Sequence, residues 1–148
     1  MTAPVLQPKP VTLFVCTTCK RPLPGLASMA AAATAKTGVP PYDTPGHDFA
    51  AALAARFLAP DTIMVEPVEC LSVCKRPLTI ALSGGGRFGY VIGDLDPAKH
   101  LEDVVAGTKS YAATADGLVP WRERPLPFRK GVIARIPPIG FKQPEKSA

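Results

Sequence analysis

The sequence predicts an α+β sandwich, in which a four-stranded mixed sheet is covered by two helices. A chain of 148 residues is long enough for one domain with its own hydrophobic core. Hydrophobic residues make up 47% of the chain and charged residues 20%, which is typical of a globular domain. Its apolar segments follow the order strand–helix–strand and then strand–strand–helix. This order predicts a β-α-β unit extended by an antiparallel hairpin and a second helix.

The β-α-β unit is predicted from three segments in the first half of the chain. Residues 11–16, VTLFVC, are a short apolar run rich in β-branched residues, as in a buried strand. The helix is expected to have Thr44 as its cap and Pro45 at its first position. Its apolar stripe has a spacing of four residues and consists of Phe49, Leu53 and Phe57. Residues 62–70, TIMVEPVEC, predict the second strand.

The hairpin and the second helix follow directly. Residues 78–95 predict two strands joined at the three consecutive glycines 84–86, a turn short enough to make the strands antiparallel. The second helix has Asp96 as its predicted cap and Pro97 at its first position. One face of this helix is apolar and consists of Leu101, Val104, Val105 and Thr108.

Two segments differ in composition from these elements. The alanine-rich residues 26–38 are bounded by prolines and glycines and are predicted to form a loop. Residues 121–148 are rich in proline and carry seven Lys and Arg but two Asp and Glu, whereas residues 1–120 carry ten of each kind. We therefore predict a globular domain over residues 1–120 and a basic, proline-rich extended arm over residues 121–148. A neutral body with a basic arm indicates docking to an acidic partner.

All four cysteines lie in two segments that share the pentapeptide CKRPL. Residues 16–23 read CTTCKRPL and residues 70–78 read CLSVCKRPL, and each cysteine pair follows a predicted strand. Because the two strands of a β-α-β unit are parallel, their carboxyl ends meet at one edge of the sheet. The sequence therefore predicts that four sulfur ligands converge into a metal site. These ligands are Cys16, Cys19, Cys70 and Cys74.

Three kinds of site agree with this pattern. A 2Fe-2S cluster needs two thiolates on each iron, and the two pairs supply them. Zinc also accepts four cysteines, although domains that use it this way are often too small to have a core. A thiol–disulfide oxidoreductase places a C-x-x-C motif after its first strand but requires a single pair. The residues themselves leave the three alternatives open.

The second cysteine segment resembles a known family. Residues 70–82, CLSVCKRPLTIAL, are similar to the second cysteine pair of thioredoxin-like 2Fe-2S ferredoxins, a group that includes the Shethna-type ferredoxins and a small subunit of respiratory complex I. In this group a C-x-x-x-C motif precedes a proline and an apolar strand, and Cys70, Cys74 and Pro77 match it. The order of elements matches over about residues 11–112. The first pair departs from the family, which spaces these cysteines more widely than Cys16 and Cys19.

The resemblance implies a thioredoxin-like fold and a 2Fe-2S cluster held by the four cysteines. It implies an electron carrier for single electrons and no enzymatic activity. The whole chain, with FVCTTC and CLSVCKRP, resembles more closely an uncharacterised bacterial family of small predicted metal-binding proteins. Members of that family are often encoded beside cobalamin-biosynthesis genes, which implies a role in cobalamin metabolism.

Basic residues follow the last cysteine of each pair. Positive charge beside an anionic cluster favours its reduced form, and it also favours docking of an acidic redox protein. The residues in question are Lys20, Arg21, Lys75 and Arg76. Pro77 starts the strand after the second pair, and by resemblance the peptide bond before it is a candidate for the cis form.

Other classes of protein are not supported by the sequence. No nucleic-acid recognition motif accompanies the basic arm. No apolar run approaches the roughly 20 residues of a membrane span, and the first residues lack the layout of a secretion signal. We therefore expect a cytoplasmic protein, in a compartment where thiols stay reduced. The sequence does not decide the oligomeric state and leaves a homodimer open.

Overall fold

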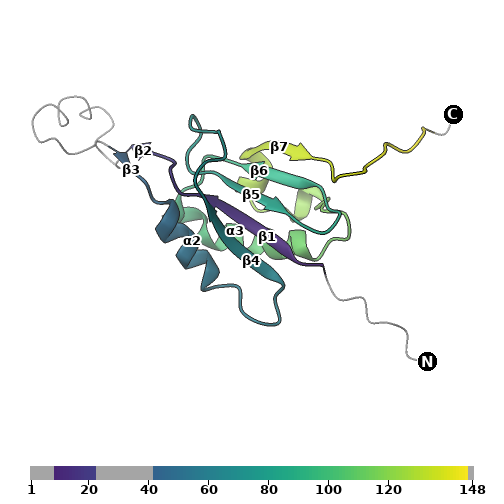
Figure 1. Ribbon diagram of the computed structural model, residues 1–148, viewed down its shortest axis with the longest axis horizontal. Helices are drawn as coiled ribbons and strands as arrows, with labels where there is room; N and C mark the ends of the chain where they lie inside the picture. Colours follow the sequence, from purple (N-terminus) through teal and green to yellow (C-terminus); the bar gives the residue numbers. More distant parts are fainter. Residues whose placement is uncertain (1–8, 23–41, 147–148) are drawn as a thin grey trace, which may run out of the picture.

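The protein has two layers, a β-sheet and a group of helices that covers one of its faces. The computed structural model describes residues 9–22 and 42–146. In Figure 1 the sheet lies in front and the two longer helices lie behind it. Within the described ranges, no helix is both long and apolar enough to cross a membrane. The loop predicted for residues 26–38 lies outside the described residues.

The sheet has five strands in the order β4-β1-β5-β6-β7. They are β1 (Val11–Cys16), β4 (Ile63–Val68), β5 (Ile80–Ser83), β6 (Gly89–Ile92) and β7 (Val132–Ile136). β1 and β4 are parallel, while the pairs β1–β5, β5–β6 and β6–β7 are antiparallel. The predicted β-α-β unit and the predicted hairpin are thus confirmed. A separate ribbon pairs β2 (Arg21–Pro22) with β3 (Tyr42–Asp43).

Two helices cover the rear face of the sheet. They are α2 (Gly46–Ala54) and α3 (Pro97–Ala112). α3 begins as predicted, because the Asp96 side chain accepts hydrogen bonds from the backbone N–H groups of Ala98 and Lys99. The prediction that Thr44 caps α2 is wrong. Pro45 occupies the cap position, and no side chain makes a capping hydrogen bond there.

The core lies between the sheet and these helices. Alternate residues of β1 are fully buried, namely Val11, Leu13 and Val15. They meet aromatic and aliphatic side chains of the helices and the other strands, which include Phe49, Leu53, Ile80, Leu82, Ile92, Val104 and Tyr111. This period of two along the strands produces one face buried by helices and one face over which residues 9–22 and 42–146 place no helix. Phe57, the third residue of the predicted α2 stripe, lies just beyond the helix and is also buried.

The predicted number of four strands is wrong because the segment expected as an extended arm contains a fifth. After a short 3-10 helix η1 (Trp121–Glu123) and helix α4 (Pro127–Lys130), β7 pairs with β6. The prolines of this segment lie outside the strand, which itself reads VIARI and is rich in β-branched residues. Phe128 packs as a buried anchor, 4% exposed, whereas Trp121 is 58% exposed.

Candidate functional site

The two cysteine pairs lie on neighbouring loops at one end of the sheet. Cys16 is the last residue of β1 and stands opposite Val68, the last residue of β4, in the parallel register. Cys19 follows in the loop after β1, and Cys70 and Cys74 lie in the loop after β4. The sequence predicted this placement from the parallel arrangement of the two strands.

Hydrogen bonds continue the pairing of β1 and β4 beyond the ends of the strands. The backbone N–H groups of Thr17 and Thr18 donate to the carbonyl oxygens of Val68 and Glu69 at 2.8 and 3.2 Å. The Thr18 hydroxyl also donates to the Glu69 carbonyl, and the Cys16 thiol lies 3.5 Å from the same oxygen. The loop that carries the first pair is thus fixed to the residue that directly precedes Cys70.

The pairs differ in their exposure to solvent. Cys16 and Cys19 are each 2% exposed, whereas Cys70 and Cys74 are exposed, and all four are free thiols. The Cys19 thiol contacts the hydroxyl of the buried residue Thr79 at 3.8 Å. The Cys70 sulfur accepts a hydrogen bond of 3.1 Å from the Ser72 backbone N–H. One pair is therefore part of the core, and the other is open to a partner.

The two buried thiols have pKa values shifted in opposite directions. Burial raises the pKa of the Cys16 thiol, but hydrogen bonds from Cys19, from Thr18 and from the backbone of Leu71 outweigh it, so the pKa lies below its usual value. Burial, together with the hydrogen bond to Cys16, raises the pKa of Cys19 to about 11. Cys16 is therefore the first of this pair to become a thiolate, which is the form that binds metals.

The four basic residues beside the cysteines fall into two classes. Arg21 pairs with Asp43 at 3.1 Å and lies 3.6 Å from Asp96. Arg76 pairs with Asp94 at 2.7 Å. Lys20 and Lys75 are both exposed, and no ion pair is formed by either among the described residues. The arginines thus hold the loops in place, and the lysines supply the open positive charge.

Two glycines support the cysteine loops, and the sequence reasoning missed both. A Cβ on Gly46, the first residue of α2, would lie 2.0 Å from the Cys16 carbonyl oxygen. A Cβ on Gly93 would lie 2.9 Å from the carbonyl oxygen of Arg76 in the second loop. Each glycine therefore allows a close approach of the backbone to one cysteine loop. A glycine directly after proline at the start of a predicted helix was the available signal for Gly46.

Pro77 lies where the second loop meets β5. The peptide bond that precedes Pro77 is not among the cis bonds of the described residues, whereas the bond from Pro77 to Leu78 is cis. The cis form that the family resemblance suggested for the bond before Pro77 is therefore not found there. The Thr79 hydroxyl donates to the Arg76 carbonyl at 3.2 Å. Because the same hydroxyl contacts the Cys19 thiol, Thr79 links the base of the second loop to the first cysteine pair.

The donor set fits a thiophilic metal or cluster, although the thiols do not converge in this structure. In the part of the chain that the structure describes, no group of three or more His, Cys, Asp or Glu side chains is arranged to hold a metal ion. The backbone nevertheless places two pairs of soft sulfur donors on adjacent loops. The first loop is buried and hydrogen-bonded to β4, and the second is exposed, so the second pair is the part that would adjust when a metal binds.

Comparisons with known proteins agree with this fold. No curated protein matches the chain. Among solved structures, a thioredoxin-like 2Fe-2S ferredoxin from Aquifex aeolicus is similar with a TM-score of 0.50 and 16% sequence identity, over 90% of this chain and 99% of that chain. This similarity confirms the thioredoxin-like α+β fold class. Residues 13–138 match the family described as "Protein of unknown function (DUF1636)". Since this match covers most of its length, the chain belongs to the DUF1636 family.

Proposed function

We propose that this protein is a one-electron carrier whose 2Fe-2S cluster is bound by Cys16, Cys19, Cys70 and Cys74. The observation that carries the proposal is the hydrogen-bonded junction of the two cysteine loops, in which Thr17 and Thr18 donate to Val68 and Glu69. This junction brings two cysteine pairs, which are separated by the 50 residues between Cys19 and Cys70, to one end of a sheet. The similarity to the Aquifex aeolicus ferredoxin supports the proposal through the fold.

The chemistry of the donors supports a cluster of this type. Two pairs of thiolates complete the coordination of two irons, and the cluster, when bound, takes up and releases one electron at a time. The buried pair, Cys16 and Cys19, holds its end of the site within the core. Of these two thiols, Cys16 has a pKa below its usual value and is the first to form a thiolate. The exposed loop of Cys70 and Cys74 completes the site from the solvent side.

The exposed lysines are assigned to docking. Lys20 and Lys75 follow the last cysteine of each pair and are open to solvent. They offer positive charge to an acidic redox protein that delivers or accepts the electron. Arg21 and Arg76 position the loops through Asp43 and Asp94. Residence in the cytoplasm, where thiols stay reduced, and a place in cobalamin metabolism belong to the same proposal.

Anaerobic purification with analysis of iron, sulfide and zinc tests the cluster directly. We expect two irons and two sulfides per chain, and a paramagnetic resonance signal that appears on reduction with dithionite. Cys74→Ser should abolish or strongly alter that signal, while Val73→Ala in the same loop should leave it unchanged. A colourless protein with one zinc per chain would contradict the proposal and establish the zinc site instead.

The first cysteine pair favours a second candidate, a thiol–disulfide oxidoreductase. Cys16 and Cys19 are both buried and have pKa values shifted in opposite directions, as in an asymmetric dithiol. In that reaction Cys16 would attack a disulfide and Cys19 would resolve the mixed disulfide, with two electrons passing to the substrate.

A variant without the second pair separates the two candidates. If Cys70→Ser with Cys74→Ser retains a reversible disulfide between Cys16 and Cys19 and reduces a model disulfide as fast as the wild type does, the oxidoreductase is supported. If the double variant loses iron and has no such activity, the electron carrier is supported.

A further inference from the structure

Thr79 is a fully buried polar residue between the two cysteine loops. It directly precedes β5 and is 0% exposed. Its backbone carbonyl oxygen accepts a hydrogen bond of 3.0 Å from the N–H of Cys16. Its hydroxyl lies 3.8 Å from the Cys19 thiol and donates to the Arg76 carbonyl oxygen at 3.2 Å. One residue therefore contacts both cysteines of the first pair and the base of the second loop.

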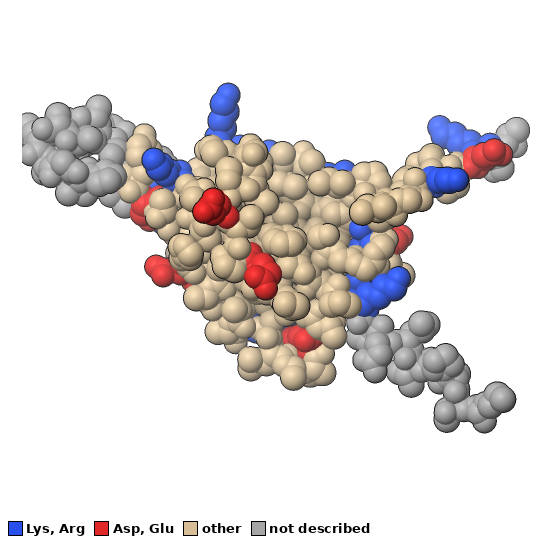
Figure 2. Space-filling model, viewed as in Figure 1, with Lys and Arg blue, Asp and Glu red and all other residues tan. Residues whose placement is uncertain are grey.

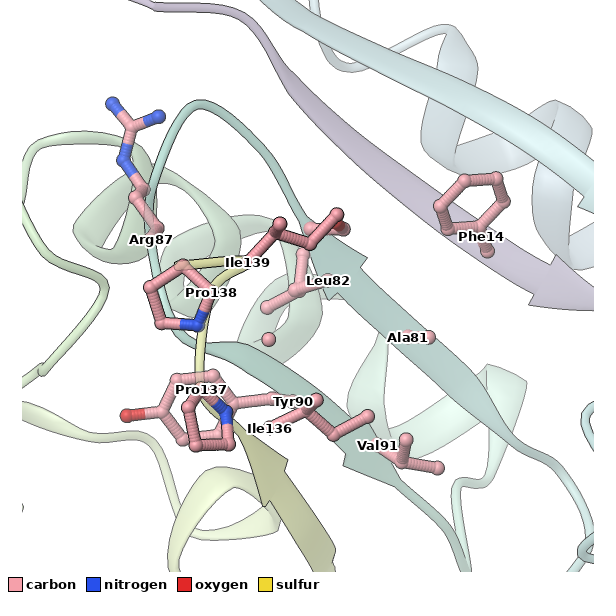
Figure 3. A pocket seen from close by; sticks show the side chains of 12 residues that line it. Phe14, Ala81, Leu82, Arg87, Tyr90, Val91, Ile136, Pro137, Pro138 and Ile139 are labelled. Atoms are coloured by element: carbon pink, nitrogen blue, oxygen red, sulfur yellow. The ribbon is translucent and has the colours of Figure 1, made fainter. Parts of the chain in front are cut away.

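The register of the sheet places Thr79 on the same side as the first cysteine. Phe14 and Ala81 are paired on β1 and β5, and both line a hollow of about 280 Å³ on the face opposite α2 and α3 (Figure 3). Cys16 and Thr79 each stand two positions from this pair, toward the cysteine end of the sheet. Because side chains alternate along a strand, they belong to the same side. Both are buried and neither lines the hollow, so the Thr79 hydroxyl faces protein groups.

The Thr79 hydroxyl can change its hydrogen-bond acceptor. In the thiol form, the Cys19 S–H donates to the Thr79 oxygen, and the hydroxyl hydrogen goes to the Arg76 carbonyl. A sulfur that binds a metal has lost its hydrogen, so it accepts hydrogen bonds and no longer donates them. The Arg76 carbonyl also accepts from the Asp94 N–H at 3.0 Å, so it keeps a partner when the hydroxyl turns to the sulfur.

The buried sulfur of Cys19 needs donors from the protein. Cys19 is 2% exposed, and a charged sulfur at such a position is costly unless it is hydrogen-bonded. Burial, followed by the Cys16 thiol, raises the pKa of the Cys19 thiol to about 11, and the groups that oppose this rise are the hydroxyl and the backbone of Thr79. Thr79 is therefore the residue that favours the charged form of this ligand.

Burial also separates Thr79 from the charged surface. Lys, Arg, Asp and Glu side chains lie at the surface in Figure 2, and Lys75 beside the second pair is exposed. The effect of an exposed charge on the site is screened by salt. Thr79 and Cys19 are both buried, so a hydrogen bond between them is stronger than in water and is not screened. Salt therefore distinguishes the contribution of Thr79 from that of the lysines.

We propose that Thr79 is a positioning residue of the metal site, whose hydroxyl turns from the Arg76 carbonyl to the Cys19 sulfur when that sulfur binds a metal. The proposal rests on the proposed function in taking Cys19 as a metal ligand, but it does not depend on whether the metal is iron or zinc. In the electron carrier, this hydrogen bond favours the more negative, reduced form and raises the reduction potential.

Cadmium titration of the full-length apoprotein, without oxygen and against a competing chelator, tests the proposal without iron. Thr79→Val keeps the branched shape of the side chain but removes the hydroxyl, and it should lower the affinity for Cd²⁺ by about tenfold or more. Thr79→Ser retains the hydroxyl and should restore most of the affinity. Urea unfolding should show that Thr79→Val changes the stability of the apoprotein little, because the Arg76 carbonyl keeps the Asp94 N–H.

Thr108→Val is the matched control. Thr108 lies in α3 and is also 0% exposed, and its hydroxyl has no hydrogen-bond partner among residues 9–22 and 42–146. The variant removes a buried hydroxyl from the same type of residue, away from the cysteines. The affinity for Cd²⁺ should therefore be that of the wild type.

The reduction potential of the protein as isolated provides a second measurement. Thr79→Val should lower the ratio of reduced to oxidised cluster by about threefold to tenfold at a given potential, which corresponds to about 30–60 mV for one electron. This shift should be the same at low and high salt, because the hydrogen bond is buried.

Three results would overturn the proposal. The first is an unchanged affinity for Cd²⁺ in Thr79→Val, and the second is an equal loss in Thr79→Val and Thr79→Ser. The third is a loss of apoprotein stability in Thr79→Val as large as its loss of affinity, which would make the hydroxyl a structural bond to Arg76. A protein isolated without iron would contradict the electron carrier alone, since the Cd²⁺ titration would still decide the role of Thr79. A wild type that does not bind Cd²⁺ would contradict both.

Discussion

The two CKRPL segments share five residues but differ in the burial of their cysteines and in the position of the preceding strand in the sheet. The first follows β1, which has a strand on each side, and its cysteines are 2% exposed. The second follows β4, an edge strand that contains Pro67, and its cysteines are exposed. The same tetrapeptide KRPL thus begins a small ribbon in one place and leads into β5 in the other. The position of the strand, central or at the edge, determines how rigidly a cysteine pair is held.

The arginines show the same contrast. Arg21 contacts two carboxylates, those of Asp43 and Asp96, and its side chain is 23% exposed. Arg76 contacts one carboxylate, that of Asp94, and its side chain is 35% exposed. An exposed ion pair contributes about 0–1 kcal/mol, and a shared, less exposed one contributes more. The first loop is therefore fixed more strongly than the second.

The difference in exposure between the two cysteine pairs should have its largest effect on alkylation of the reduced apoprotein. At about pH 8 iodoacetamide should modify Cys70 and Cys74 about 100-fold faster than Cys16 and Cys19. The buried pair reacts only after a local opening, which at about 3 kcal/mol accounts for that factor. Timed quenching and mass spectrometry of peptides measure the four rates. If all four cysteines react at equal rates in the folded protein, the distinction between the loops is refuted. As a control, the four cysteines should react at similar rates in urea, where the protein is unfolded.

The pKa of Cys19 adds a dependence on pH to this experiment. Because its pKa is raised to about 11, Cys19 remains a protonated thiol at pH 8 and reacts more slowly than burial alone dictates. Raising the pH toward 11 increases its thiolate fraction and should increase its rate. Cys16, with a pKa below its usual value, should gain less over the same range.

Alanine at the two supporting glycines compares the loops by stability. Gly46→Ala places a methyl group 2.0 Å from the backbone oxygen of Cys16 and should lower the free energy of unfolding by about 2–3 kcal/mol. The gain of about 1 kcal/mol in helix propensity is included in this net value. Gly93→Ala should cost about 1–2 kcal/mol, because its nearest contact is the end of the Ile133 side chain at 2.7 Å and the Arg76 carbonyl oxygen lies further away, at 2.9 Å.

Urea unfolding of the apoprotein measures both costs. Ala51→Ser is the matched control for the first variant, since Ala51 is an exposed residue of the same helix and its change should stay within about 0.5 kcal/mol. If Gly46→Ala is as stable as the wild type, the close contact between α2 and the first cysteine loop is not required.

Much of the fold could be predicted from local sequence patterns, and the placement of the cysteine pairs could be predicted from the topology of the β-α-β unit. β1 was predicted with its observed bounds because VTLFVC is a short apolar run rich in β-branched residues, and α3 was predicted because Asp96 and Pro97 mark its start. The placement of both cysteine pairs at one end of the sheet needed only the rule that a β-α-β unit has parallel strands. These features depend on residues close together in the chain or on a single topological rule.

The missed features depend on contacts between distant residues. β7 was overlooked because prolines surround VIARI, and its pairing with β6 spans about 40 residues. The partners Asp43 and Asp94 stand 22 and 18 residues after Arg21 and Arg76, at separations with no helical or strand period. Sequence reasoning assigned all four basic residues to the surroundings of the cluster because it did not anticipate these carboxylates.

The smallest expected effect is on the reduction potential of the proposed cluster, which compares the contributions of Lys75 and Arg76. Because Asp94 neutralises Arg76, we expect Lys75→Gln to lower the potential by about 20 mV and Arg76→Gln to change it less. Asp94→Asn removes a negative charge and should raise the potential by a similar amount. One exposed charge at about 8 Å contributes about 0.5 kcal/mol, which corresponds to about 20 mV for one electron.

Spectroelectrochemical titration measures these potentials. The control is Lys142→Gln, which removes the same charge as Lys75→Gln but at the opposite end of the protein. The shifts should shrink as salt is added, because exposed charges are screened over about 10 Å at 0.1 M ionic strength. A larger change for Arg76→Gln than for Lys75→Gln would mean that the ion pair with Asp94 does not cancel the arginine. The two basic residues of the second CKRPL segment would then act on the cluster together, as the sequence alone predicted.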